Sequence, residues 1–197
     1  AFDRAAEREQ VQASVVAAIL HVETGCGRNT GDEVILYRIA RLAMANEPAN
    51  REENVRRNAT VNGVRDPELE RQTRARGKYL EDLFYPEVLA TFAVARRMNV
   101  QPLDLLGSGA GAFGFPQFLP TSFLKHGTDG NGDGAVSLFD YDDAASSAAR
   151  YLAQHGWKPG ISHAEKRKVI WYYNRSDAYI DTVLALADRL DAPPRAE

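Results

Sequence analysis

The order of apolar and polar residues along the chain follows a helical period nearly throughout. Apolar residues recur every three or four positions, as they do on the buried face of an α-helix. No run of useful length alternates with the period of two that a half-buried strand requires. The pattern therefore predicts an all-α fold, with one or two short hairpin-like pieces allowed around glycine-rich loops. The expected helices cover residues 6–24, a stretch beginning near 33, 79–98 with a bend at Pro86, 142–155, 162–174 and 176–190.

Several of these helices carry signals at their ends. Gly25 and Gly27 follow the first helix, and glycine readily takes the left-handed conformation in which many helices end. In a capping box, a serine or threonine precedes a glutamate by three residues, and each satisfies a backbone amide of the other. This spacing predicts capping boxes at Thr30–Glu33 and Ser162–Glu165.

Residues 51–78 differ from the rest of the chain. They contain eight arginines and lysines, five acids and very few large apolar residues. Asp66 followed by Pro67 is typical of a helix start, so the end of this segment is expected to be helical. We interpret residues 50–78 as a polar, charged insertion into a single domain that spans residues 1–197.

Composition limits the classes of function. The chain has 197 residues, of which 44% are apolar and 26% charged, and this is enough for one domain with a core or at most two small ones. The net charge of -3 gives no general attraction to nucleic acid or to a membrane surface. No apolar run is long enough to span a bilayer, and the only cysteine, Cys26, excludes an internal disulfide. We expect a monomer with no nucleic-acid partner and no membrane span in this sequence.

An acid lies where the first helix should present its apolar face. Glu23 shares that face with Leu20, Ile19 and Val16, which precede it by three, four and seven positions. A desolvated carboxyl prefers its neutral form, so Glu23 would have a raised pKa, as a general acid near neutral pH requires. The alternative is that Glu23 caps the helix or pairs locally, for instance with Arg28, and takes no part in chemistry.

The segment GSGAGAFGFPQFLPTSF is too rich in glycine for a packed helix and too aromatic for a simple linker. Phe113, Phe115 and Phe118 would supply flat apolar surface for sugar rings. Ser108 and Gln117 offer donors and acceptors for hydroxyl or acetamido groups. The alternative is a tight turn over core aromatic residues. Near the end of the chain, Tyr173 and Asn174 form a further polar pair in IWYYNRSDAY, and helical spacing turns the tyrosine inward, where its hydroxyl needs a partner.

The segment DGNGDGAVSLFD has the spacing of an EF-hand calcium loop. Gly134 falls at the sixth position, where such a loop turns sharply, and oxygen donors alternate before it. The expected ligands are Asp129, Asn131, Asp133, the carbonyl of Ala135, Asp140 at the twelfth position, and Asp143 if the loop is longer than usual. Hard oxygen donors on a tight turn suit calcium, and a single loop of this kind is typical of a structural ion. The alternative is a turn rich in Asp, Asn and Gly without an ion.

Five motifs occur in the order found in one family. VETGCGR, GSGAGAFGFPQFLPTSF, DGNGDG with the later LFD and DDA, YLAQHGW and YYNRSDAYI resemble the lytic murein transglycosylases of the MltB type. The match runs from about residue 11 to 190 and is interrupted by the insertion. The resemblance implies a lysozyme-like helical domain with a glycine-rich substrate loop and an EF-hand-like calcium loop. It also implies a periplasmic or cell-envelope protein whose export signal is not part of this sequence.

In that family the glutamate of the VET motif is the only catalytic acid, which maps to Glu23. The resemblance further places Ser108, Gln117, Phe118, Tyr173 and Asn174 along the glycan groove, with Tyr173 orienting either Glu23 or an acetamido group of the sugar. The partners would be peptidoglycan glycan strands, and the only cofactor a structural calcium ion, with no organic cofactor.

The implied reaction cleaves the β-1,4 bond between N-acetylmuramic acid and N-acetylglucosamine. Glu23 would protonate the leaving oxygen and then accept the proton of the muramic acid 6-hydroxyl, which closes a 1,6-anhydro ring. A retaining hydrolase usually needs two carboxylates, and no good second candidate stands out in the sequence. Two alternatives stay open: a muramidase that hydrolyses the same bond, and a non-catalytic, calcium-stabilised glycan-binding module.

Overall fold

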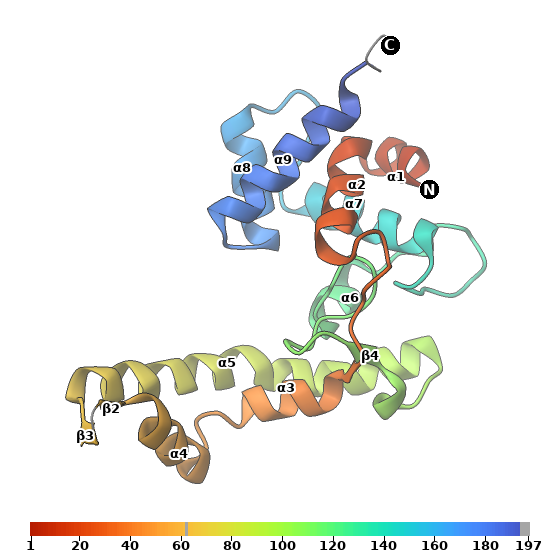
Figure 1. Cartoon of the computed structure of the whole chain (residues 1–197). Coiled ribbons are helices and arrows are strands. Elements are labelled where there is room, and N and C mark those ends of the chain that lie inside the picture. Colours follow the sequence, from red (N-terminus) through yellow and green to blue (C-terminus); the bar gives the residue numbers. More distant parts are fainter. Residues whose placement is uncertain (62, 194–197) are drawn as a thin grey trace. The chain divides into compact units, whose positions relative to one another are not determined.

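The computed structural model describes residues 1–61 and 63–193 and groups them into two compact units. The first unit comprises Ala1–Gly31, Phe113–Phe118 and the described residues from Ser122 onward. The second comprises the described part of Asp32–Ala112 together with Leu119–Thr121. Helices dominate both units (Figure 1), which confirms the all-α prediction. That the chain acts as a single domain stays a prediction.

The first unit is built from helices around one apolar core. Its elements are α1 (Phe2–Glu9), α2 (Ala13–Thr24), most of α6 (Pro120–His126), α7 (Tyr141–Gln154), α8 (His163–Tyr173) and α9 (Asp177–Asp191). Helix α2 packs against α9, α7 and α1 and contributes Ile19 and Leu20, which have no exposed surface. Burial of each such side chain stabilises the fold by on the order of 1.5–3 kcal/mol. The facing side of α7 consists largely of alanines and serines, which let the neighbouring helices approach closely.

Two helix starts differ from the sequence prediction. The stretch 6–24 is not one helix, because Gln10 takes a left-handed conformation that ends α1, and α2 begins at Ala13. The capping box expected at Thr30–Glu33 is absent: Glu33 lies in a short strand, and the next helix starts at Ile35 without a side-chain cap. A short strand at Glu33–Val34 is therefore present where the spacing predicted a helix cap.

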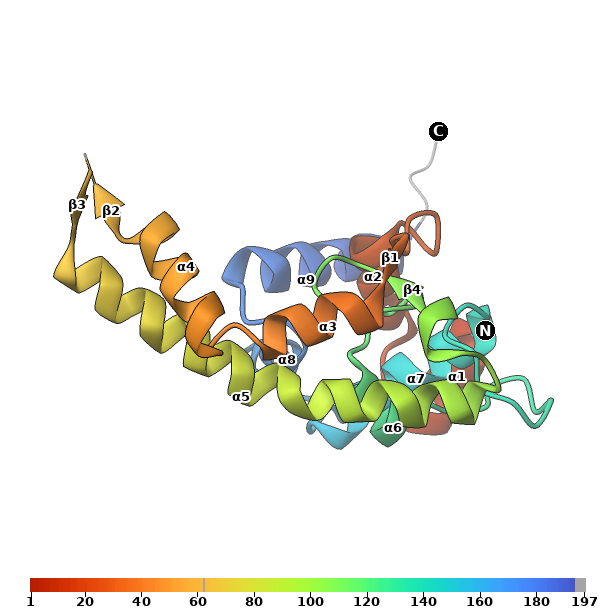
Figure 2. The ribbon, with the colours of Figure 1, turned by 90° about the horizontal axis from the view of Figure 1, so that it is seen from below.

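Among its described residues, the second unit contains two short antiparallel ladders, three α-helices and one 3-10 helix. Its elements are β1 (Glu33–Val34), α3 (Ile35–Ala43), α4 (Pro48–Asn58), β2 (Thr60–Val61), β3 (Val64–Arg65), α5 (Pro67–Met98), the 3-10 helix η1 (Pro102–Asp104) and β4 (Leu106–Gly107). Strand β1 pairs with β4, and β2 pairs with β3. Helices α3 and α4 pack along α5 (Figures 1 and 2).

The charged segment 50–78 forms most of α4, the β2–β3 hairpin and the first turns of α5. Asp66 caps α5 as predicted, since its carboxylate accepts the amides of Glu68 and Leu69 at 2.8 and 3.1 Å. The helix then continues without interruption through Pro86, so the helix predicted for 79–98 is longer at its start. Most described side chains of the segment are at least partly exposed, although Val55 is fully buried.

The second predicted capping box is present. Ser162 Oγ accepts the amide of Glu165 at 3.3 Å, and the Glu165 carboxylate accepts the amide of Ser162 at 2.8 Å.

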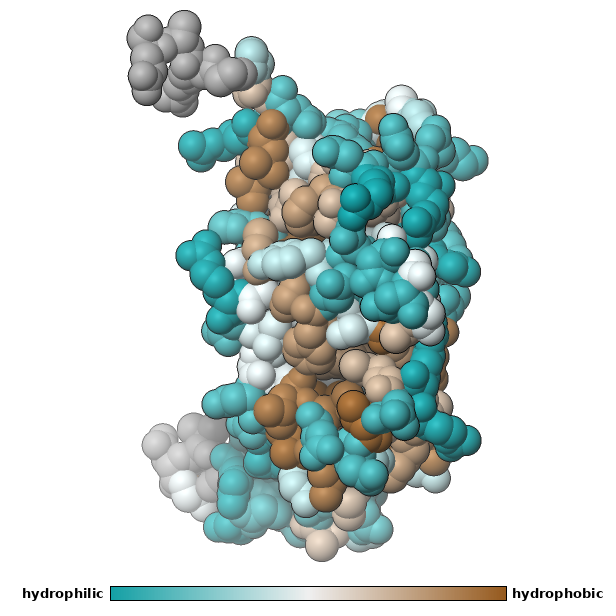
Figure 3. All heavy atoms as spheres, turned by 90° about the vertical axis from the view of Figure 1, so that its right-hand side faces the viewer, coloured by the Kyte–Doolittle hydropathy of each residue, from teal (hydrophilic) through white to brown (hydrophobic). Residues whose placement is uncertain are grey.

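Apolar side chains also reach the surface, as the brown patches of Figure 3 show on one face. Within the described ranges, no helix is both long and apolar enough to cross a membrane.

Candidate functional site

Glu23 lies in the last turn of α2, on the side of the helix that faces the core. Its helical neighbours Leu20, Ile19 and Val16 are all fully buried, as the spacing predicts, and Glu23 itself is half-buried. The helix ends directly after Thr24 because Gly25 adopts φ 60°. The carboxyl group is thus held at a rigid helix end and partly withdrawn from water.

A tyrosine from α9 fixes one oxygen of this carboxyl group. The hydroxyl of Tyr179 donates a hydrogen bond of 2.7 Å to Glu23 Oε1. Burial raises the pKa of Glu23, and the hydrogen bond from Tyr179 opposes part of that rise. The pKa of Tyr179 is itself raised, by burial and by the charge of Glu23, so its hydroxyl keeps the proton that it donates. Glu23 therefore has the character of an acid that holds its proton to higher pH than an exposed glutamate.

The surroundings of Glu23 do not support the alternative that it forms an ion pair with Arg28. The guanidinium of Arg28 donates from Nε to the carbonyl oxygen of Gly25 at 3.1 Å. Among the described residues, no ion pair of Glu23 with an arginine or lysine is present. The carboxyl group is left with one hydrogen-bond donor, Tyr179, and a second oxygen available to a ligand.

Tyr173 points inward as predicted, but its hydroxyl has a different partner from the one expected. It donates to the carbonyl oxygen of Pro116 at 2.5 Å. Its ring stacks on that of Tyr179, with centroids 6.5 Å apart and planes 12° from parallel. The contact to Glu23 is made by Tyr179, which the sequence analysis missed. A tyrosine in the first turn of a helix, six residues after another inward tyrosine, was the available signal.

The second half of the glycine-rich segment forms a tight turn. Phe113 and Phe118 pair through their backbones, and both rings are almost completely buried. Phe118 packs on Tyr151 and Tyr173, with ring centroids 5.5 and 5.9 Å apart. These two phenylalanines are therefore core aromatic residues, the alternative reading of the sequence, and the expectation that Phe118 offers open sugar-binding surface is wrong. Phe115 stays half-buried.

Gln117 lies in this turn with its amide held in place. Its backbone takes φ 51°, and its Nε2 donates to the carbonyl oxygens of Gly114 and Thr30 at 2.9 and 3.2 Å. Both amide hydrogens are thus engaged, which leaves Oε1 as an acceptor for a hydroxyl or amide group.

Two further predicted residues are placed differently. Ser108 is part of the second unit, where its hydroxyl lies 3.3 Å from the amide and from the carbonyl of Ala112 and closes a turn. Asn174 ends α8 with an extended backbone and is exposed. These positions do not test the roles expected for Ser108 and Asn174 in the glycan groove, so both roles stay predictions.

A second set of contacts holds the turn that follows Glu23. Thr24 Oγ1 accepts the amide of Gly27 at 2.9 Å and lies 3.0 Å from the carbonyl oxygen of Phe115, to which it donates. Gly27 has φ 84°, and a Cβ there would lie 2.5 Å from the ring of Phe115. Only glycine allows this close approach. The loop after Glu23 and the glycine-rich turn are therefore packed into one assembly.

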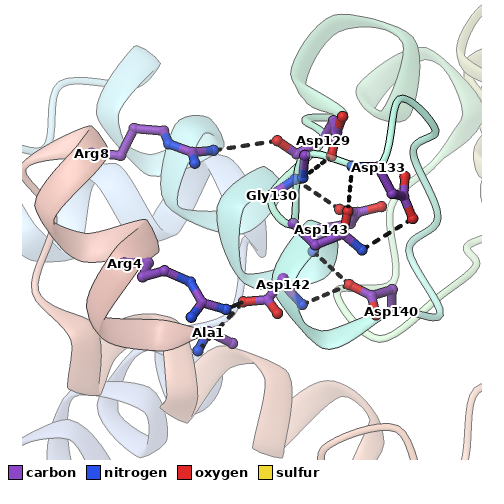
Figure 4. A network of polar contacts seen from close by, with 11 residues as sticks. Ala1, Arg4, Arg8, Asp129, Gly130, Asp133, Asp140, Asp142 and Asp143 are labelled. Atoms are coloured by element: carbon purple, nitrogen blue, oxygen red, sulfur yellow. Dashed lines mark hydrogen bonds and ion pairs between the residues drawn. The ribbon is translucent and has the colours of Figure 1, made fainter.

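The predicted metal loop is an ordered turn with many internal hydrogen bonds (Figure 4). Asp129 accepts the amides of Gly132 and Gly134 at 2.6 and 2.9 Å, while Asp133 accepts the amide of Ala135 at 2.8 Å. The pKa of Asp129 is lowered, chiefly by the hydrogen bond from Gly134. Asp129, Asn131 and Asp133 thus turn side-chain oxygens towards the backbone of their own loop.

Asp143 closes this loop and Asp140 does not. The buried carboxylate of Asp143 accepts the amides of Gly130 and Ser137, both at 2.7 Å, and so joins the two ends of the loop. Asp140 Oδ1 accepts the amides of Asp142 and Asp143 and caps α7 instead (Figure 4). Within the described residues, no three His, Cys, Asp or Glu side chains are grouped closely enough to hold a metal ion.

A cavity of about 450 Å³ in the first unit lies apart from this chemistry. Its wall includes Val11, Trp157 and Lys166, and Glu23 is not part of it. Glu23 is the candidate catalytic residue, because its carboxyl group combines partial burial, a raised pKa and a fixed hydrogen-bond donor.

Comparison with known proteins identifies the family. A family model described as the transglycosylase SLT domain matches residues 1–166. Over 161 residues the chain is 32% identical to the membrane-bound lytic murein transglycosylase B of Escherichia coli (strain K12). The aligned region covers 81% of this chain and 36% of that protein. The chain therefore spans about a third of the length of this curated relative.

Solved structures agree with this assignment. The structure resembles the soluble lytic transglycosylase SltB1 of Pseudomonas aeruginosa with a TM-score of 0.74 and 25% identity, over 96% of this chain and 73% of that one. It also resembles the Escherichia coli lytic transglycosylase Slt35 in complex with calcium, with a TM-score of 0.69 and 23% identity, over 95% of this chain and 68% of that one. The expected lysozyme-like helical fold is thereby confirmed, and the calcium loop stays a prediction. With five ordered motifs and a family model over 166 of its 197 residues, the chain belongs to the transglycosylase SLT family.

Proposed function

We propose that this protein is a peptidoglycan lytic transglycosylase. It would cleave the β-1,4 bond between N-acetylmuramic acid and N-acetylglucosamine and leave 1,6-anhydromuramic acid ends. The observation that carries the proposal is the half-buried carboxyl of Glu23, with its raised pKa and its hydrogen bond from Tyr179, in a chain of the SLT family. A general acid of this kind is what glycosidic cleavage requires.

In the first step Glu23 acts as the acid. Tyr179 donates to Oε1, so the catalytic proton resides on Oε2 and is transferred to the bridging glycosidic oxygen. The bond between the muramic acid C1 and that oxygen breaks, and N-acetylglucosamine leaves with the proton. The acetamido group of the substrate stabilises the positive charge that develops at C1.

In the second step the same carboxylate acts as the base. It accepts the proton of the muramic acid 6-hydroxyl while the 6-oxygen bonds to C1, and this closes the anhydro ring without consuming water. Glu23 is then protonated again and ready for the next cleavage. One carboxyl group suffices, because the substrate supplies both the nucleophile and the charge stabilisation. No organic cofactor enters the reaction.

We assign the substrate contacts to the polar residues that the resemblance to the family indicates. Gln117 Oε1 is free to accept from a sugar hydroxyl or acetamido N–H. Tyr173 supports the site through Pro116 and through its stack on Tyr179. Ser108 and Asn174 would contact the glycan strand itself.

Product masses test the proposal directly. Purified peptidoglycan sacculi are digested, and the released muropeptides are weighed. A transglycosylase yields anhydro products, each one water lighter than the hydrolysed form. Reducing-end products alone would identify a muramidase instead. Glu23→Gln should abolish release, whereas Glu7→Gln, a change at an exposed glutamate of α1, should leave it intact. If the unmodified chain releases nothing but binds sacculi, it is a glycan-binding module.

We further propose that the loop 129–143 binds a structural calcium ion. Asp129, Asn131, Asp133, the Ala135 carbonyl and Asp143 supply the hard oxygen donors that calcium prefers. Asp140 fits less well, because it is committed to capping α7. Bound calcium would strengthen a turn that backbone hydrogen bonds already shape.

A melting experiment tests the ion. Calcium in excess should raise Tm relative to the chain in chelator, by an amount that grows with free calcium. Asp143→Asn should remove most of this difference, and Asp188→Asn, at an exposed position of α9, should not. Equal Tm values with calcium and with chelator would contradict an ordered ion.

The chemistry also indicates where the protein acts. Its partner would be the glycan strand of the cell wall, so we place it in the periplasm or cell envelope, acting as a monomer. Release of muropeptides from intact sacculi by the monomeric fraction of a sizing column would support this assignment.

A further inference from the structure

The turn that follows Glu23 has an unusual backbone. Gly25, Cys26 and Gly27 all have positive φ values, of 60°, 58° and 84°. A left-handed conformation is costly for a residue with a side chain, so Cys26 persists there only if its surroundings hold it. The turn directly extends the helix end that carries Glu23, so whatever holds Cys26 also helps to hold the acid.

Cys26 is held by a side chain from a distant segment, Tyr141, in addition to the nearby His21, whose Nδ1 lies 3.9 Å from Cys26 Sγ. The hydroxyl of Tyr141 donates a hydrogen bond of 2.8 Å to the carbonyl oxygen of Cys26. Tyr141 is the first residue of α7, and the cap that Asp140 provides fixes that helix start. The tyrosine is therefore anchored at its backbone and engaged at its hydroxyl.

The same segment contacts the glycine-rich turn. The carbonyl oxygen of Leu138 accepts the amide of Phe115 at 2.8 Å. The ring of Tyr141 packs on Phe115 with centroids 4.9 Å apart, and Phe139 meets Phe115 edge-on at 6.4 Å. Phe115 in turn lies against Gly27, where a Cβ would be 2.5 Å from the ring. Residues 138–141 thus support both the turn after Glu23 and the turn that carries Gln117.

We infer that Tyr141 is a positioning residue of the catalytic site, which holds the left-handed turn 25–27 and through it the orientation of Glu23. The inference rests on the proposed function and deepens it. Tyr141 touches no reacting atom; it acts on the acid through the Cys26 carbonyl and the Phe115 ring. Because Tyr141 is 49% exposed, its ring contributes little to the core, so its role can be separated from folding.

The test compares Tyr141→Phe, which keeps the ring and removes the hydroxyl, with Tyr141→Ala, which removes both. Loss of one hydrogen bond should raise the equilibrium constant for opening of the turn by about 2–10-fold. Amide hydrogen exchange in a peptide covering residues 21–30 should accelerate by that factor in Tyr141→Phe and by more in Tyr141→Ala. The kcat for glycan cleavage should fall in the same order, while KM stays within about twofold.

Tyr172→Phe is the matched control, because Tyr172 is an exposed tyrosine of α8 whose hydroxyl is not needed by the turn. It should change neither exchange nor kcat. Unaltered exchange over residues 21–30 in Tyr141→Phe would overturn the inference, as would a change in KM alone. The exchange measurement does not depend on catalysis, so it decides whether Tyr141 holds the turn 25–27 even if the unmodified chain releases no anhydro product, while the kcat comparison tests the positioning of Glu23.

Discussion

The hydrogen bond between Tyr179 and Glu23 should set the upper pH limit of activity. Replacement of Tyr179 by phenylalanine removes the donor to Glu23 Oε1 and keeps the ring that stacks on Tyr173. That donor favours the carboxylate over the neutral acid, so its removal raises the pKa of Glu23 beyond the rise that burial already causes. The acid would then stay protonated to higher pH.

The size of the effect follows from the strength of such a bond. A hydrogen bond to a charged group contributes about 1.5–3 kcal/mol, and the half-buried position of Glu23 favours the lower end. Since 1.36 kcal/mol corresponds to a tenfold change, the alkaline limb of the kcat/KM profile should move up by roughly one pH unit. The limb reports the free enzyme, so the substrate does not obscure it.

The assay is the rate of anhydro-muropeptide release from one batch of sacculi across pH 4 to 10, measured for the unmodified chain and for Tyr179→Phe. Tyr173→Phe and Tyr172→Phe serve as comparisons. Tyr173→Phe removes a hydroxyl that donates to Pro116, and Tyr172→Phe removes one on an exposed side chain. Neither variant should therefore shift the alkaline limb of the pH profile. An alkaline limb that stays in place or moves to lower pH in Tyr179→Phe would refute the assignment of Glu23 as the acid tuned by Tyr179.

Three further predictions concern stability. The pKa of Glu23 is higher in the folded state than in the unfolded state, so this group favours folding at low pH and loses that contribution as pH rises. Glu23→Gln should therefore raise Tm at pH 7 by roughly 2–4 °C and leave Tm unchanged near pH 3, as measured by calorimetry. Gly27→Ala should cost about 1–3 kcal/mol in urea unfolding, because its φ is 84° and a Cβ would collide with Phe115; an unchanged midpoint would mean that the turn relaxes freely. Burial lowers the pKa of His126 to about 4, so folding should weaken as pH falls from about 6.5 to 4, and His126→Leu should show a flatter dependence on pH over that window.

Much of the first unit could be predicted from residue periodicity. The buried face of α2 follows from the 3.6-residue period, which indicates which side of a helix is buried whatever its neighbours are. The capping box at Ser162 and the cap at Asp66 were also recognisable, because both depend only on residues within one turn. The direction in which Glu23 points could likewise be predicted, because it depends only on the spacing of residues within one helix.

The features that the sequence did not predict depend on contacts between distant segments. Glu33 has the spacing of a capping residue, yet it pairs with Gly107, which is far away along the chain. Tyr173 and Tyr179 are both inward tyrosines, and only the three-dimensional arrangement decides which of them reaches Glu23. Asp140 occupies the expected twelfth position of the metal loop, but the start of α7 competes for its carboxylate. Spacing alone does not encode such competition.

Four of the hydrogen bonds that hold the surroundings of Glu23 share one property: their acceptors belong to the main chain. Four side-chain donors, those of Thr24, Gln117, Tyr141 and Tyr173, end on the carbonyl oxygens of Phe115, Thr30, Cys26 and Pro116. Every residue type carries such a carbonyl, so exchange of the side chains of Cys26 or Thr30 does not remove an anchor. A mutant library built at these two positions should therefore keep these four hydrogen bonds and the position of Glu23.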